Sequence, residues 1–151
     1  MTDVLFVISF LVCQHFTCFA LMLHKDNHIE KKSEKIYAPK AHTMHCQEPW
    51  FSFIQKGVKP VEGRKATPKH LAIQPGDIIE FFCDDRHFLA EVERIERFGS
   101  LDDYFHTVGL AKALPGILSL EEGKKIYLQW STEQEIATFG FLGIFVKPLS
   151  T

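Results

Sequence analysis

A short basic patch carries the side chains best suited to binding chemistry in this chain. Between Lys56 and Lys69, five cations accompany a single acidic residue, and they are Lys56, Lys59, Arg64, Lys65 and Lys69 beside Glu62. A local patch of this kind attracts phosphate even though the whole chain carries a formal charge of -2. The patch is too small for tight nonspecific binding to a duplex, so it predicts a restricted site for an anionic or polar ligand.

The segment that precedes the patch has the pattern of a short helix. Pro49 suits a first helical position, and Trp50, Phe53 and Ile54 follow at helical spacing. Gly57 can adopt the left-handed conformation that ends a helix. We therefore expect a helix that places the start of the basic patch just beyond its C-terminal end.

The patch itself is expected to be extended. Pro60 restricts Lys59 to extended conformations, so in a strand Lys59 and Val61 share one face while Glu62 and Arg64 share the other. Two interpretations follow. The segment is either a solvated strand edge, on which Glu62 and Arg64 form a surface ion pair of little energy, or one wall of a binding cleft.

The central part of the chain has the pattern of a β-hairpin. Ile78–Cys83 is short, apolar and aromatic, a polar turn follows, and residues 88–92 alternate between apolar and other side chains. The alternation breaks after Val92, because Ile95 and Phe98 are out of phase with it. This break predicts a β-bulge or a bend at a barrel corner.

The C-terminal part contains two sequence signals for helix starts. Ser100 with Asp103 begins one helix, which ends near Gly109, and Ser119 with Glu122 begins another. The apolar face of the second helix is expected to comprise Ile126, Tyr127 and Trp130, with Gly123 weakening its interior. Residues 136–146 are apolar and rich in β-forming side chains, so we expect them to supply the closing strands.

Taken together, several of these segments resemble the signature of the ASCH domain family. The resemblance comprises Pro49-Trp50, the short helix, I-x-x-G-x-K and V-E-G-R, followed by the P-G-D turn before Ile78 and a later helical region, and it covers about residues 46–151. ASCH domains are similar to PUA domains. The resemblance therefore implies an α+β fold with a small, partly open β-barrel and peripheral helices.

The same resemblance implies a function in nucleic-acid or nucleotide binding. The family includes the RNA-binding-like domain of activating signal cointegrator and small bacterial hydrolases of acetylated cytidine. The implied partner is RNA or a modified nucleoside, with a protein partner as an alternative. The candidate ligand-binding residues are Trp50, Lys59, Glu62, Arg64, Lys65 and Lys69. The charged residues would contact phosphates or a base edge, and Trp50 would either stack on a base or be buried between its helix and the barrel.

An amidohydrolase that acts on an acetylated cytidine-like nucleoside is the alternative function. In those relatives, the resemblance implies a lysine after the motif glycine, a threonine nucleophile three residues later and a separate glutamate for proton transfer. Lys59 matches the lysine, but Glu62 occupies the threonine position, and the separate glutamate has no clear counterpart. If the chain is an enzyme, Lys59 would polarise a carbonyl and Glu62 would activate water.

The first 43 residues differ in character from the rest of the chain. Residues 4–23 are nearly continuously apolar and long enough to span a bilayer, although a signal peptide is a second possibility. The lysines that follow the apolar run would place a membrane-anchored domain on the cytosolic side. We favour a third interpretation, in which residues 1–43 are an extension and the ASCH domain, residues 44–151, begins at Met44.

Composition and motifs exclude several other functions. The length of 151 residues at 46% hydrophobic content allows one ordinary globular domain. Cys46 and Cys83 stand alone in the domain, which fits a reducing cytoplasm or nucleus, and no zinc-binding spacing is present. No P-loop, dinucleotide-binding motif, nucleophile elbow or H-E-x-x-H occurs, so we expect neither a cofactor nor a metal.

Overall fold

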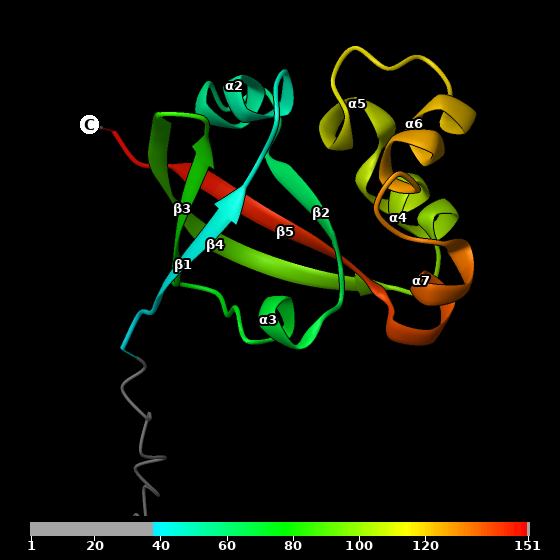
Figure 1. Cartoon of the computed structure of the whole chain (residues 1–151), viewed down its shortest axis with the longest axis horizontal. Helices are drawn as coiled ribbons and strands as arrows, with labels where there is room; N and C mark the ends of the chain where they lie inside the picture. The colour runs from blue at the N-terminus through cyan, green and yellow to red at the C-terminus, as the bar shows by residue number, and fades with distance from the viewer. Residues whose placement is uncertain (1–37, 151) are drawn as a thin grey trace, which may run out of the picture. The chain divides into compact units, whose positions relative to one another are not determined.

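The computed structural model describes residues 38–150 as a mixed α+β domain (Figure 1). The elements follow one another as β1 (Ala41–His45), α2 (Trp50–Gln55), β2 (Val61–Lys65), α3 (Pro68–Leu71), β3 (Ile78–Cys83), β4 (Arg86–Phe98), α4 (Leu101–Val108), α5 (Leu110–Ala113), α6 (Leu120–Tyr127), α7 (Glu133–Phe139) and β5 (Phe141–Pro148). The predicted fold class is confirmed.

The five strands form one curled sheet in the order β1-β3-β4-β5-β2. β1 pairs with β3 in parallel, and the other neighbouring pairs are antiparallel. The sheet wraps into the half-barrel of a PUA-like fold, with α2 and α3 at opposite ends and α4 to α7 gathered on one side (Figure 1). β1 and β2 are the two edge strands, and this partly open barrel is what the family resemblance implies.

The predicted hairpin is formed by β3 and β4, and it has the predicted irregularity. Phe81 pairs with Phe88 and Ile79 with Ala90, and all four side chains are buried. Beyond the hairpin, the register against β5 shifts between Val92 and Arg94. The predicted break after Val92 is therefore a true β-bulge, and it lets one long strand bend across the sheet.

The helix α2 is present, but its buried face differs from the predicted one. Phe51 and Ile54 are completely buried, whereas Phe53 and Trp50 are only partly buried. Phe51 and Ile54 are three positions apart and so lie on one face of the helix. Gly57 has a φ of 70°, which confirms that it takes the left-handed conformation after the helix end.

Two hydrophobic clusters fill the domain. One lies within the half-barrel, beneath α2, and includes Phe51, Ile79 and Phe81. The other packs α4, α5, α6 and α7 against β2, β4 and β5, with Tyr104 at its centre. Trp50 packs against both clusters, so the start of α2 lies where the two cores meet.

The expectation of closing strands across residues 136–146 is wrong for its first part. Ile136 lies in α7, and the strand β5 begins at Phe141. The helix starts with a complete capping box, in which the Thr132 hydroxyl accepts from the Glu135 backbone N–H and the Glu135 carboxylate accepts from the Thr132 N–H. Local capping therefore outweighs the β propensity of the residues inside the helix.

The predicted face of the helix α6 also needs correction. Ser119 caps it as predicted, but the helix ends at Tyr127, so Trp130 lies beyond it. Gly123 is buried within the helix, and a β-carbon there would come 2.9 Å from a methyl group of Leu110. The glycine that weakens the helix interior thus permits close packing of α6 on its neighbours.

The first strand begins upstream of Met44. Lys40 and His42 both contact the carboxylate of the fully buried Asp77, through the Lys40 backbone N–H at 2.7 Å and His42 Nε2 at 2.8 Å. The Gln74 N–H donates to the same carboxylate. Asp77 of the P-G-D turn therefore connects the start of β1 to the start of β3.

The interpretation of residues 4–23 as a membrane anchor or signal falls on a segment outside the described residues. Within residues 38–150, no helix has the length and apolar character needed to cross a bilayer.

Candidate functional site

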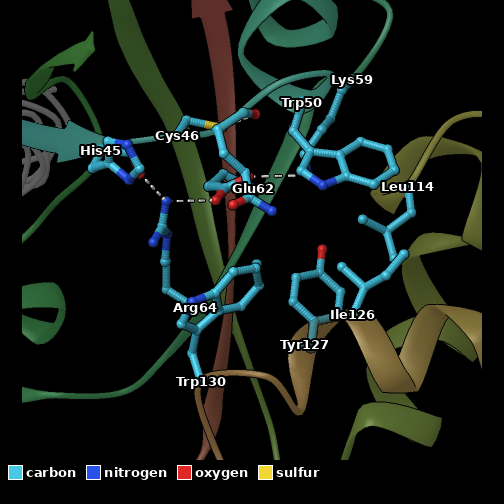
Figure 2. Close-up of a pocket in the computed structure, with 12 residues that line it drawn as sticks. His45, Cys46, Trp50, Lys59, Glu62, Arg64, Leu114, Ile126, Tyr127 and Trp130 are labelled. Carbon is cyan, nitrogen blue, oxygen red and sulfur yellow. Dashed lines mark hydrogen bonds and ion pairs between the residues drawn. The ribbon is translucent and has the colours of Figure 1, made fainter. Parts of the chain in front are cut away.

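A cavity of about 210 Å³ lies where the two cores meet. β2 supplies Glu62, Gly63 and Arg64, and the segment from β1 to α2 supplies four further residues. The complete lining is His45, Cys46, Gln47, Trp50, Lys59, Glu62, Gly63, Arg64, Leu114, Ile126, Tyr127 and Trp130 (Figure 2). The structure thus brings four of the six predicted ligand-binding residues, Trp50, Lys59, Glu62 and Arg64, into one site.

Lys59 is a buried structural cation at this site. Its side chain is 1% exposed, and its ammonium donates to the backbone carbonyl oxygens of Val61 and Ala113, the latter at 2.6 Å. The same ammonium lies 3.1 Å from Glu62 Oε2. An ammonium has three protons, so these three acceptors use all of its donor capacity. Lys59 therefore holds β2, α5 and Glu62 together.

Glu62 is buried between two cations. Its Oε1 lies 2.8 Å from an Arg64 amino nitrogen, and its Oε2 faces Lys59. Burial by itself would raise the pKa of the Glu62 carboxyl, but the adjacent Lys59 ammonium and Arg64 guanidinium lower that pKa below its ordinary value. Glu62 is consequently an ionised carboxylate that can only accept hydrogen bonds.

Arg64 connects the two edge strands of the half-barrel. The amino nitrogen that pairs with Glu62 also donates to the backbone carbonyl oxygen of His45, at the end of β1. Arg64 and Glu62 share one strand face, as predicted, but they form a partly buried pair instead of a pair on a solvated edge. Within residues 38–150, the buried Arg64 Nε has no hydrogen-bond partner.

Aromatic side chains line the cavity on more than one side. In Figure 2, the indole of Trp50 lies beside Glu62, and the rings of Tyr127 and Trp130 lie below it in the view. Hydrogen bonds hold the Tyr127 side chain in position, since its hydroxyl lies 3.3 Å from the Tyr104 hydroxyl and 3.5 Å from the Ala113 carbonyl oxygen. Trp130 is 58% exposed and stands at the rim.

The two remaining predicted residues lie outside the cavity lining. Lys65, at the end of β2, forms an ion pair of 3.0 Å with Glu135 of α7. Lys69 lies on α3 and is exposed to solvent. Their distance in sequence from Arg64 is short, but the strand and the turn after it direct them away from the cavity.

Sequence reasoning did not assign a site role to several of the lining residues. Ile126 and Tyr127 lie in α6, and Leu114 directly follows α5, so their part in the site depends on tertiary contacts. The lining residues between β1 and α2, such as Cys46, come shortly before Trp50 in the sequence. Their closeness to Trp50 is the sequence signal that indicates their place in the site. Burial, the largest effect, together with the Glu62 carboxylate raises the pKa of the Cys46 thiol, so this thiol is unreactive near neutral pH.

The curled five-stranded sheet with its peripheral helices is the half-barrel of a PUA-like α+β fold, and it carries a charged cavity with aromatic walls. The family model of the ASCH domain matches residues 44–141, and the chain belongs to this family. No curated protein sequence matches the chain.

Two solved structures from Pyrococcus have similar folds. One is the crystal structure of the hypothetical protein PH0355, whose sequence is 32% identical to this chain. The match covers 73% of this chain and 99% of the PH0355 chain, with a TM-score of 0.67. The solution structure of protein PF0455 from Pyrococcus furiosus is 28% identical, covers 74% of this chain and 99% of its own, and has a TM-score of 0.63. Both relatives span the domain almost completely.

Proposed function

We propose that the domain is an RNA-binding module that holds one unpaired base in the cavity beside Glu62. The observation that carries this proposal is the combination of aromatic walls with a buried, ionised carboxylate. Aromatic side chains stack on the faces of bases, and polar groups at the end of a pocket bind base edges. A cavity of about 210 Å³ suits one ring system better than a length of strand.

The charges in the cavity support a nucleotide over a cationic ligand. Aromatic cages with a carboxylate also bind methylated ammonium groups. Here Glu62 is balanced by two cations, Lys59 and Arg64, so the cavity has an excess positive charge. This excess opposes a cation, and it favours a neutral base attached to phosphate. Arg64 supplies the cationic side of the cavity for such a nucleotide, whereas Lys65 and Lys69 lie outside the lining.

The same contacts disfavour the amidohydrolase alternative. Lys59 would need a proton to polarise a substrate carbonyl, but its three protons already have acceptors in the protein. Glu62 would need a raised pKa to act efficiently as a base near neutral pH, and its pKa is lowered instead. We therefore assign both residues to ligand binding and to the support of the site.

The cysteines are compatible with an RNA-binding role inside the cell. Cys46 and Cys83 are both buried and free, as expected in a reducing compartment. We infer a cytoplasmic or nuclear location on this basis.

Binding of short single-stranded RNA, measured by fluorescence anisotropy at several salt concentrations, tests the proposal. Trp130→Ala is expected to weaken binding by about tenfold, because it removes an exposed stacking surface worth roughly 1–3 kcal/mol. Leu118→Ala is the matched control, since Leu118 is 93% exposed and does not line the cavity. Equal weakening by both variants, or no binding by the wild-type protein, would refute the proposed site.

A second assay separates binding from hydrolysis. The wild-type protein is incubated with acetylcytidine, and the release of cytidine is followed by chromatography. We expect no release above that of buffer alone. Release that disappears in Glu62→Gln would replace the binding proposal with the amidohydrolase.

A further inference from the structure

The polar groups of the cavity differ in how many of their hydrogen-bonding positions are already used. Lys59 has none left, because its ammonium donates to two backbone carbonyls and to Glu62. Each Glu62 oxygen faces one cation, and each carboxylate oxygen has capacity for a further donor. Arg64 has a buried Nε–H that lacks a partner among the described residues. The unused capacity is therefore an acceptor at Glu62 and a donor at Arg64.

This acceptor and this donor are adjacent. Glu62 and Arg64 are joined by a contact of 2.8 Å, so a ligand that reaches one carboxylate oxygen is close to the guanidinium as well. An ionised carboxylate cannot donate, and a guanidinium cannot accept. A ligand that satisfies both must present an N–H donor and an acceptor side by side on one edge.

We propose that the site reads the Watson–Crick edge of the bound base, with Glu62 accepting from an edge N–H and Arg64 donating to the neighbouring acceptor. This inference depends on the proposed function and adds the ligand edge to it. Each common base has such a donor–acceptor pair on that edge, and the edge is free only when the base is unpaired. The site therefore selects unpaired bases and rejects those whose edge N–H has been replaced.

Arg64 is the member of the charged group that can adjust to the ligand. Its side chain is 28% exposed, whereas those of Lys59 and Glu62 are 1% and 8% exposed. A buried donor without a partner is unfavourable, so a movement that pairs the Arg64 Nε–H with a base acceptor is favoured when the base enters. Lys59 keeps Glu62 in place while Arg64 moves.

The test compares two positions of a methyl group on the same base. The probes are short single-stranded RNAs of the common base that binds most tightly, either unmodified, methylated at the Watson–Crick edge nitrogen, or methylated at a carbon remote from that edge. For a uridine strand, these modified bases are 3-methyluridine and 5-methyluridine. Dissociation constants are measured with the full chain by fluorescence anisotropy.

In the wild-type protein, edge methylation is expected to weaken binding by about tenfold or more, as a lost base-edge pair does. Remote methylation is expected to change binding by less than about threefold. For each protein, the dissociation constant of the edge-methylated strand is divided by that of the remotely methylated strand. In Glu62→Gln this ratio is expected to fall, because a neutral amide discriminates the edge less sharply than a carboxylate does. The ratio does not depend on the fraction of folded protein, so partial unfolding of this variant does not obscure it.

Equal binding of both methylated strands by the wild-type protein would overturn the inference, and the aromatic cavity would then stack on a base without reading its edge. The proposed function would survive that result if Trp130→Ala still weakens binding. If the wild-type protein binds none of the unmodified strands, the proposed function fails, and this inference fails with it.

Discussion

The Tyr127 hydroxyl lies so close to the backbone of Gly63 that a β-carbon on this glycine would be 2.7 Å from the hydroxyl oxygen. The ring of Phe141 would also be 2.8 Å from that carbon. Gly63 is therefore needed for the close packing of α6 and β5 against β2, and it keeps one wall of the cavity in place.

Gly63→Ala is expected to destabilise the domain by roughly 1–3 kcal/mol, because two buried aromatic rings must move to accommodate a methyl group. Urea unfolding followed by circular dichroism measures this loss. Gly99→Ala is the matched control, since the nearest atom outside its own neighbours would be 3.9 Å away. A Gly63→Ala variant as stable as the Gly99→Ala variant would contradict the close packing of Tyr127 and Phe141 on Gly63.

Lys59→Ala is expected to lower the free energy of unfolding by about 3 kcal/mol, because it leaves the buried Glu62 and the Ala113 carbonyl without one of their partners. Lys69→Ala, which removes the same kind of side chain from an exposed position, is expected to change stability by less than about 0.5 kcal/mol. Chemical denaturation of both variants compares the two lysines directly. Similar losses would show that Lys59 is not the buried connection between β2 and α5.

The stability of the domain is expected to depend on the ionisation of Glu62. The folded-state pKa of Glu62 lies below its ordinary value of 4.5, so the carboxylate contributes stability above pH 4.5 that is lost as the pH falls through the folded-state pKa. Glu62→Gln lacks this ionisation. The difference in unfolding free energy between the wild type and Glu62→Gln should therefore be largest near neutral pH and shrink in acid. A difference that stays constant with pH would contradict a stabilising role for the ionised Glu62 carboxylate.

A chain that begins at Met44 is expected to be less stable than one that begins at Ala38. It lacks the Lys40 N–H and the His42 imidazole that contact the buried Asp77, and it loses the first pairs of β1 with β3. A buried acceptor that loses partners costs about 1–3 kcal/mol. Thermal unfolding compares the two chains, and His42→Ala in the full chain tests the Asp77 contact alone.

Much of the fold could be predicted because its signals are local. The β3–β4 hairpin, the bulge after Val92 and the turn at Gly57 each depend on neighbouring residues, and the structure confirms them. The helix α7 also has a local signal, because the pattern from Thr132 to Glu135 is typical of a helix start. The β-forming residues that follow favour a strand, so the two local signals conflict at this position.

The site was less predictable because its shape depends on contacts between distant segments. The sequence pattern places Glu62 and Arg64 on one strand face, and they do lie there. It contains no sign that Lys59 would be buried, because the acceptor that holds it, the Ala113 carbonyl, is 54 residues away. The aromatic wall formed by Tyr127 depends in the same way on the packing of α6.

The position of the cavity between the two cores has a practical consequence for finding its ligand. A ligand in the cavity contacts side chains that belong to both hydrophobic clusters, so it opposes the separation of one cluster from the other. Ligands that bind only the folded state raise the melting temperature by an amount that grows with the logarithm of their concentration relative to the dissociation constant. A library of nucleosides, nucleotides and short RNAs can therefore be ranked by thermal shift alone, before any reaction or cellular partner is known.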